Sequence, residues 1–311
     1  MVGWFYSMVA FDHCQTIMIS VVLMITLPIA FLVYAKLCFV QPYAINYTFK
    51  LIAFNGITEL LSCVTFLLCY QLATYQFMYG FYQFLIRNNL VRTLTTLDNA
   101  LSGCALHSAL FVSLNRLKTI ITIKRKGKDS AFFVISILLC ILLTLPQVVD
   151  FCTTSTSFYL VFPEYAVLMP QTNSTDHTLR DVNSVITTVV SLSTLLVNVT
   201  LAVLLFRERH SIEISENRRI SAEKGLIITS VVSYVFYMLY FVSNVVARYL
   251  GSFVGGFVQF LFLGLSAITP FWCLMLFTPS IRRIAFTVKE ESSRISVRSM
   301  TPTKDSMHRR Y

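Results

Sequence analysis

The stretch RLKTIITIKRKGKDSAFFVISILLCILLTLPQVV, residues 116–149, decides the fold of this chain. Its first 13 residues hold six Lys and Arg side chains, whereas the 19 residues of 131–149 hold no charge. A run of about 20 apolar residues is long enough to cross the hydrocarbon layer of a bilayer as an α-helix. The stretch therefore predicts a basic loop followed by a transmembrane helix.

Six further apolar stretches extend this pattern along the chain. Together the seven lie at 17–40, 49–73, 93–117, 131–149, 183–206, 224–247 and 256–277. The mean hydropathy of +0.68 and the 13% share of charged residues are far from the composition of soluble proteins. We therefore expect an all-α membrane protein, a seven-transmembrane helix bundle in one domain over residues 1–289. The polar tail over 290–311 is rich in Ser and Thr, and we expect it to be disordered.

The distribution of basic residues predicts the orientation of the bundle. Of the 25 Lys and Arg residues, 21 follow helices 1, 3, 5 and 7, and only four lie in the opposite segments. Because basic loops stay in the cytoplasm, we expect the C-terminus inside the cell and the N-terminus outside. The first 16 residues hold no Lys or Arg, so we expect the first helix to insert directly, without a cleavable signal peptide. The localisation expected is the plasma membrane.

The net charge of +10 bears on the choice of partners. In a soluble protein such a charge would favour nucleic acid. Here the basic residues flank membrane helices on one side, where they contact anionic lipid or a protein partner. We therefore expect membrane lipid as a partner and no nucleic acid.

Sequons and cysteines test the predicted sidedness. Asn173 is the only Asn-x-Ser/Thr sequon in a predicted outer loop, the connection 150–182, so it is the expected glycosylation site. Cys152 lies on the same predicted side, where disulfides form. The sequence leaves open both a disulfide at Cys152, with Cys14 or Cys69 as its partner, and an unpaired thiol.

The third predicted helix carries the sharpest polar pattern. Asp98 and Arg116 are 18 residues apart, or five turns, so they share one face with about 27 Å between them. His107 is nine residues from each of them and therefore points to the opposite side, where we expect a packing role. The face between the two charges carries short side chains at spacings of three and four: Ser102, Ala105, Ala109 and Val112. Because short side chains let helices approach closely, we expect this helix at the centre of the bundle.

A candidate ligand pocket lies at the outer end of this helix. Ionisable groups inside a membrane are costly and face the bundle interior or a water-filled cavity. Asp98 either pairs with a cationic ligand or is already paired with a nearby Arg or hydroxyl. Side chains of mixed polar and apolar character are expected beside it, between helices 3, 6 and 7. They are Ser102, Tyr237, Tyr240, Asn244 and Gln259.

The second predicted helix has one polar face. Asn55, Glu59 and Ser62 follow one another at spacings of four and three, in an otherwise apolar segment. Glu59 lies near mid-depth, where an unpaired carboxylate is not tolerated. The favoured interpretation is a structural polar hub that bonds across to neighbouring helices. Binding of a proton or a small cation is the alternative.

An arginine and a short surface helix are the two features expected at the cytoplasmic side. Arg116 begins the basic run that ends at Lys128, and it suits either an anchor at the membrane surface or a conformational latch. After the seventh helix, residues 280–289 place apolar side chains at i, i+3, i+4 and i+7 with basic residues beside them. That pattern predicts a short amphipathic helix on the inner leaflet.

Short motifs give the chain a family resemblance. They are SLNR at 113–116, AEKGL at 222–226, TPFWCL at 269–274 and SIRR at 280–283. With seven expected spans and an outer N-terminus, the chain resembles the G-protein-coupled receptors. More narrowly, it is similar to the nematode serpentine chemoreceptors of the gamma-related group, which includes the gamma, U and V classes.

The resemblance implies a chemosensory receptor that binds an external small molecule and activates a heterotrimeric G protein. It also implies a coupling face at the inner ends of the helices: Asn115, Arg116, Lys118, Arg125, Arg218 and Arg219. Two positions depart from the pattern of rhodopsin-like receptors. Asn115 replaces the acidic residue that usually precedes the arginine, and Val91 stands where a disulfide cysteine is usual, which leaves Cys152 without that partner.

Other classes of function need features that the sequence lacks. A transporter or channel would place Glu59 and His107 on a conduction path, but no internal repeat is visible. A metal hydrolase within the membrane needs several His and Asp ligands, and a retinal protein needs a Lys in 256–277, which holds none. We therefore expect neither an enzyme nor a bound metal or cofactor.

Overall fold

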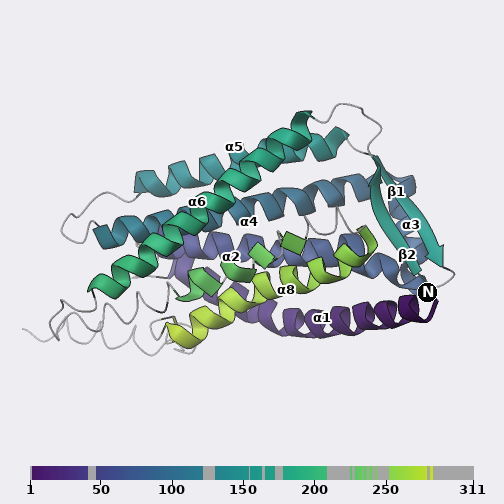
Figure 1. Cartoon of the computed structure of the whole chain (residues 1–311), viewed down its shortest axis with the longest axis horizontal. Helices are drawn as coiled ribbons and strands as arrows, with labels where there is room; N and C mark the ends of the chain where they lie inside the picture. Colours follow the sequence, from purple (N-terminus) through teal and green to yellow (C-terminus); the bar gives the residue numbers. More distant parts are fainter. Residues whose placement is uncertain are drawn as a thin grey trace, which may run out of the picture.

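The computed structural model describes most of the helical part of the chain. The described residues are 2–40, 47–121, 130–153, 155–162, 165–171, 178–208 and 252–278, with short pieces at 225, 228–232, 234–236, 238–239, 242–243 and 281–282. In the described part of the chain, the long helices run along the long axis of the molecule, with α6 crossing diagonally (Figure 1). They are α1 (Val2–Phe39), α2 (Tyr47–Phe66), α4 (Leu90–Ile121), α5 (Ser130–Thr153), α6 (Thr178–Glu208) and α8 (Ser252–Phe277).

Among the described residues, five helices are long and apolar enough to cross a membrane. They cover Val9–Phe39, Tyr47–Thr74, Ala131–Thr153, Asp181–Leu204 and Phe260–Phe277. Large apolar side chains face outward along them, as at Met24, Leu138 and Leu196, which are 77%, 60% and 67% exposed. Such surfaces are stable in lipid and costly in water. The chain is therefore a helical, multi-pass membrane protein.

The third predicted span forms α4, which differs from these five in composition. It is a continuous helix of 32 residues, about 48 Å long. Several of its polar residues, among them Asp98, Ser108 and Arg116, are buried because α4 packs against α2, α5 and α6. The sixth predicted span, 224–247, is described only in short helical pieces between 225 and 243.

The main apolar core lies between α1, α2 and α8. Phe66 of α2 stacks on Phe260 of α8 with ring centroids 5.7 Å apart, and Tyr34 of α1 meets Phe271 edge-on. Gly56 lets α1 and α2 approach closely, because a Cβ at this position would collide with the Tyr34 ring. This side of the bundle is tightly packed and contributes most of the buried hydrocarbon.

The N-terminal helix is longer than predicted. It begins at Val2 rather than near residue 17. No proline interrupts residues 2–16, so the helical backbone continues. Polar side chains of this extension contact one another and the turn after α2: the Gln71 amide lies 3.1 Å from Thr16 Oγ1, and Gln15 donates to Asp12 Oδ1 over 3.1 Å within α1.

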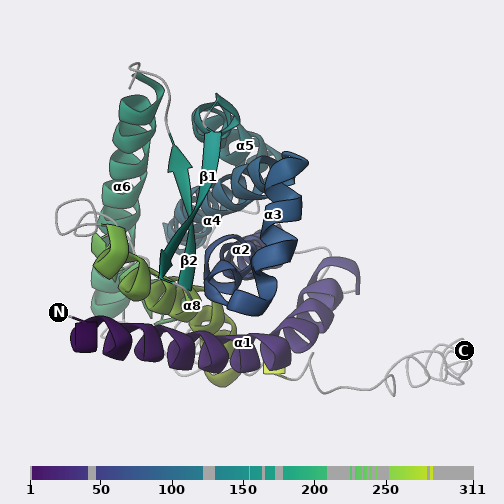
Figure 2. The same ribbon diagram turned by 90° about the vertical axis from the view of Figure 1, so that its right-hand side faces the viewer.

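One end of the bundle is covered by short turns, a short helix and a hairpin, of which only residues 67–73 fell within a predicted span. After α2 the chain forms a π turn (Leu67–Gln71), two 3₁₀ turns (Leu72–Thr74 and Gln76–Met78) and the short helix α3 (Tyr79–Arg87). The predicted long loop 150–182 contains an antiparallel hairpin of β1 (Ser155–Phe162) and β2 (Tyr165–Gln171). Figure 2 looks onto this end, where the two strands cross in front of the helices and α3 lies beside them. We call it the hairpin end.

Candidate functional site

A series of buried polar contacts joins α4 to α2. Nearest the hairpin end, Thr65 Oγ1 donates to Asp98 Oδ1 over 2.8 Å. One turn further along α4, the hydroxyls of Ser62 and Ser102 lie 2.6 Å apart. Asp98 is 4% exposed, so its carboxyl faces α2 rather than an open surface.

The middle of the series is a triad of side chains. Asn55 Nδ2 donates to Glu59 Oε1 over 2.9 Å, and Ser108 Oγ of α4 donates to Asn55 Oδ1 over 2.8 Å. Asn55 thus uses both ends of its amide, one within α2 and one across to α4. The three residues predicted as a polar hub, Asn55, Glu59 and Ser62, all lie in this helix contact.

The far end of the series reaches a third helix. Ser113 Oγ of α4 donates to Asn198 Oδ1 of α6 over 3.3 Å, and Asn115 Nδ2 donates to Thr48 Oγ1 of α2 over 2.8 Å. Arg116 follows directly and is 1% exposed. The guanidinium therefore points into the bundle instead of lying on the membrane surface, which is the position a simple anchor would take.

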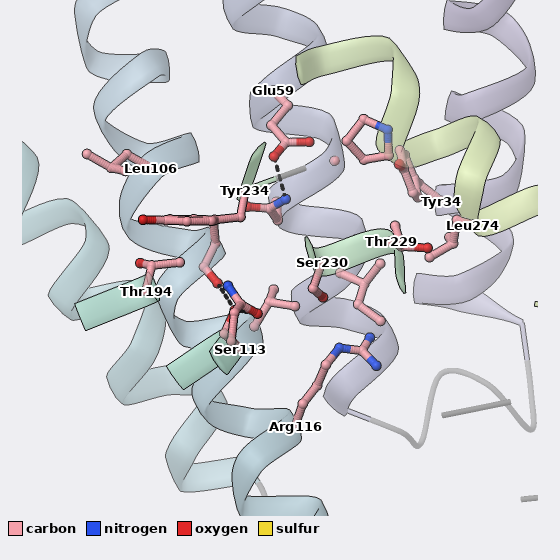
Figure 3. Close-up of a pocket in the computed structure, with 17 residues that line it drawn as sticks. Tyr34, Glu59, Leu106, Ser113, Arg116, Thr194, Thr229, Ser230, Tyr234 and Leu274 are labelled. Carbon is pink, nitrogen blue, oxygen red and sulfur yellow. Dashed lines mark hydrogen bonds between the residues drawn. The ribbon is translucent and has the colours of Figure 1, made fainter. Parts of the chain in front are cut away.

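A cavity opens beside Arg116, between α2, α4, α6, α8 and the helical pieces 228–232 and 234–236 (Figure 3). Glu59 lies at one end of it and Arg116 at the other, with Tyr234 and Thr194 on its wall. About 50 Å³ are open to the centres of water molecules. Since one water needs roughly 10–15 Å³ on this measure, the cavity has room for a few waters but not for a large ligand.

Two polar atoms favour hydration of this cavity. Glu59 Oε2 and Asn198 Nδ2 are buried, and neither has a hydrogen-bond partner among the described residues. Both residues line the cavity. Buried polar atoms of this kind are usually satisfied by ordered water.

A second void lies on the other side of Glu59. It is lined by Glu59, Ser62, Ser102 and Ser266 and leaves about 10 Å³, which is close to the space of a single water. Ser266 of α8 donates to Leu263 O over 2.8 Å, so its hydroxyl is held within its own helix. Glu59 therefore separates two small polar spaces in the middle of the bundle.

The predicted ligand pocket is only partly within the described residues. Asp98 and Ser102 bond to α2, and neither lines the larger cavity, although Ser102 lines the smaller void. Gln259 lies in α8, but its side chain is outside the described part. Tyr237, Tyr240 and Asn244 also lie outside the described residues. The outward-facing pocket between the third, sixth and seventh helices stays a prediction.

The predicted coupling residues are also only partly within the described part of the chain. Asn115 and Arg116 are buried at the end of α4, and Lys118 places Nζ 5.1 Å from the centre of the Phe132 ring of α5. Arg125, Arg218 and Arg219 lie outside the described residues, as do Asn173 and the tail 290–311. Of the predicted surface helix at 280–289, only Ile281 and Arg282 are described, and both are helical.

His107 faces away from this site, as its spacing predicted. Its Nδ1 lies 3.1 Å from Thr144 Oγ1 of α5, and the side chain is 1% exposed. Within the described part of the chain, no group of three or more His, Cys, Asp or Glu side chains could hold a metal ion. All eight cysteines are free thiols, and Cys152, for which the sequence left a disulfide open, is exposed and unpaired.

The sequence did not predict Ser113 and Asn198 as partners, nor the burial of Arg116. Asn198 lies inside the predicted span 183–206, which is otherwise largely apolar. A polar amide at that depth was itself an indication of an interhelical contact. Tyr234, within the predicted sixth span, lines the larger cavity and donates to Ser191 O over 3.1 Å.

Comparison with known proteins does not identify a function for this chain. No protein-family model matches the chain, and no curated protein matches it either. The resemblance to nematode serpentine chemoreceptors therefore depends on the short motifs quoted above, and the family assignment is a proposal.

Proposed function

We propose that this protein is a chemosensory G-protein-coupled receptor of the nematode serpentine type. An external small molecule shifts its helix bundle between two arrangements, and one of them activates a heterotrimeric G protein. The observation that carries the proposal is the line of buried polar contacts along α4. The line runs from Asp98 near the hairpin end to Arg116 beside the larger cavity.

Such a line suits a two-state switch for a physical reason. Packed hydrocarbon resists gradual deformation, whereas hydrogen-bonded side chains beside water can exchange partners between two discrete arrangements. A ligand drives the change only through different affinities for the two arrangements. Moving the equilibrium from 1:99 to 99:1 requires a difference of about 5.5 kcal/mol.

The proposal includes seven spans and an outward-facing hairpin end. The charge distribution supports it, since the basic residues follow the ends of helices 1, 3, 5 and 7. The length of α4, about 48 Å, exceeds the roughly 30 Å of a hydrocarbon layer, so its polar composition does not prevent it from crossing. With 224–247 as the sixth span, the end of α4 that carries Arg116 faces the cytoplasm.

The coupling face would consist of Asn115, Arg116 and Lys118 together with the basic loops that carry Arg125, Arg218 and Arg219. Its charge favours an acidic surface on the partner. Because Arg116 is buried in this structure, activation requires the bundle to open beside it. The larger cavity marks the place where the helices are least tightly packed around this side chain.

A cell assay tests the proposal directly. Cells that express the chain are exposed to a panel of volatile and soluble odorants, and dissociation of the G protein is followed by energy transfer between its labelled subunits. We expect a ligand-dependent response that Arg116→Ala reduces by an order of magnitude or more at equal surface expression. Lys36→Ala is the control, because it removes one positive charge from the same end of the bundle. An unchanged response of Arg116→Ala would refute the role of this residue.

A channel or transporter remains the second proposal, because Glu59 lies between two polar voids. His107, which the sequence placed on the same path, faces α5 instead and lines neither void. Ion currents that persist without any G protein and that Glu59→Gln abolishes would favour this second function.

A further inference from the structure

The short helix α3 has three distinct sides. Phe81 and Phe84, three residues apart, lie on one side of α3, and Phe77 lies in the 3₁₀ turn directly before the helix; they are 49%, 58% and 79% exposed. Gln83 and Arg87, four residues apart, form a second exposed side that is polar. The third side is turned toward the protein. We call the three phenylalanines the Phe stripe.

Contacts on the third side fix the rotation of α3. Tyr82 is 1% exposed, donates its hydroxyl to Leu68 O, and stacks parallel to Phe158 of the hairpin with ring centroids 6.4 Å apart. Burial raises the pKa of the Tyr82 phenol, which keeps it protonated as a donor. Leu168 of β2 belongs to the same cluster. Because this side is held by the hairpin, the Phe stripe cannot turn inward.

The position of α3 is level with the end of the membrane spans. The candidate span of α2 ends at Thr74, five residues before α3 begins, and α4 starts at Leu90, three residues after α3 ends. In Figure 2 the helix lies at the edge of the bundle end, beside the hairpin. This is the depth at which aromatic side chains and amphipathic helices meet phospholipid headgroups.

Charge favours lipid as the partner of this surface. Arg87 and Arg92 are both exposed, and the segment 76–97 holds no acidic residue. Two guanidinium groups beside an aromatic surface complement the phosphodiester groups of a bilayer, which arginine binds in bidentate fashion. An apolar protein surface would leave these two charges without a matching anion.

The size of the surface argues against a second copy of the chain. A phenylalanine side chain carries about 150–250 Å², so the exposed part of the Phe stripe amounts to roughly 300–450 Å². A stable dimer needs about 800 Å² on each partner. The stripe is therefore too small for a dimer contact but sufficient to hold one short helix in a membrane interface.

We propose that α3 is an interfacial anchor that seats the hairpin end in the phospholipid layer. The Phe stripe enters the edge of the hydrocarbon, Arg87 and Arg92 bind phosphate oxygens, and Gln83 faces water. The proposal requires only that the bundle crosses a membrane, and it is independent of receptor function.

Spin labels on adjacent residues test this arrangement. Phe84→Cys and Gln83→Cys are made in a Cys14→Ser/Cys152→Ser background, which removes the two exposed native thiols. Each protein is placed in phosphatidylcholine nanodiscs, and collisions of the nitroxide with oxygen and with a water-soluble nickel chelate are compared. We expect the ratio of oxygen to nickel collisions to be about threefold or more higher at position 84 than at 83. Equal ratios, or a contact that appears only with two copies in a disc, would overturn the proposal.

Photo-crosslinking gives a second readout on the unsubstituted chain. A phosphatidylcholine with a diazirine near the head of its acyl chain is irradiated in the same nanodiscs, and lipid adducts are mapped by mass spectrometry. We expect adducts on Phe77, Phe81 and Phe84 but not on Gln83. Leu138 of α5, which is 60% exposed, is the positive control. Adducts on α5 without any on α3 would contradict the lipid contact.

Discussion

A double-mutant cycle between Asn55 and Ser108 tests whether polar side chains hold α4 against α2. The Ser108 hydroxyl donates to Asn55 Oδ1 over 2.8 Å, and Ser108 is 0% exposed. Hydrogen bonds between membrane helices average about 0.6 kcal/mol and reach about 1.7. The short distance and complete burial favour the upper part of that range. We therefore expect a coupling free energy of about 1–1.7 kcal/mol.

The single variants differ because Asn55 serves two partners. Asn55→Ala removes the donor to Glu59 Oε1 and the interhelical acceptor of the Ser108 hydroxyl, which keeps Ala105 O as its acceptor within α4, so we expect a loss of about 1–3 kcal/mol in the free energy of unfolding. Ser108→Ala removes one donor and should cost about 1 kcal/mol. The assay is reversible unfolding in lipid bicelles for the parent chain, both single variants and the double variant.

Ser136 supplies the matched control for this cycle. It is 1% exposed and donates to Phe132 O within its own helix, α5. The effects of Asn55→Ala and Ser136→Ala should therefore add within about 0.5 kcal/mol. If the Asn55–Ser108 pair were equally additive, the contact would contribute nothing specific, and the polar line along α4 would lose its energetic basis.

Three further predictions address packing and orientation. Gly103→Ala should cost about 1–3 kcal/mol of unfolding free energy, because its Cβ would lie 2.9 Å from Thr144 Cγ2. At Gly80 an added Cβ meets nothing within 4 Å, so Gly80→Ala should stabilise the protein by up to about 1 kcal/mol. Thermal melts in bicelles compare the two variants, and equal effects would contradict the close α4–α5 contact. Trp272→Phe removes the 3.0 Å bond from Trp272 Nε1 to Thr26 Oγ1 and should cost about 0.6–1.7 kcal/mol, measured in the same way. Cys152 should react with a membrane-impermeant maleimide on intact cells, to an extent that Cys152→Ser lowers; labelling only after permeabilisation would place the hairpin end in the cytoplasm.

The helices were predictable because the bilayer imposes their length and composition. A backbone in hydrocarbon must satisfy its own hydrogen bonds, so each apolar run of sufficient length indicates a helix. That argument could not predict the start of α1 at Val2, which depends on polar partners such as Gln71 near the end of α2. It also missed the hairpin, whose stability comes from the contact of Phe158 and Leu168 with Tyr82, far away in the sequence.

The candidate site was predictable as far as helical periodicity reaches. Spacing along one helix placed Asn55, Glu59 and Ser62 together, and it turned His107 away from Asp98. Spacing says nothing about which helix lies opposite, so the partner of Ser113 in α6, 85 residues away, could not be derived. The burial of Arg116 was missed for the same reason, since it depends on how far the neighbouring helices extend beyond it.

Two regions of the bundle differ in how freely they can rearrange. Between α1, α2 and α8 lies the main apolar core, where displacement of a side chain opens a void or forces an overlap. Where α6 and the pieces 228–232 and 234–236 face α4, a cavity has room for a few waters and is bordered by Arg116 and Asn198. Water can replace a lost partner there at small cost, so two arrangements can differ by only a few kcal/mol. If the bundle is a switch, its motion should therefore occur on the α6 side, while α1, α2 and α8 remain fixed. Label pairs between α4 and α6 should then change distance on activation, whereas pairs between α1 and α2 should not.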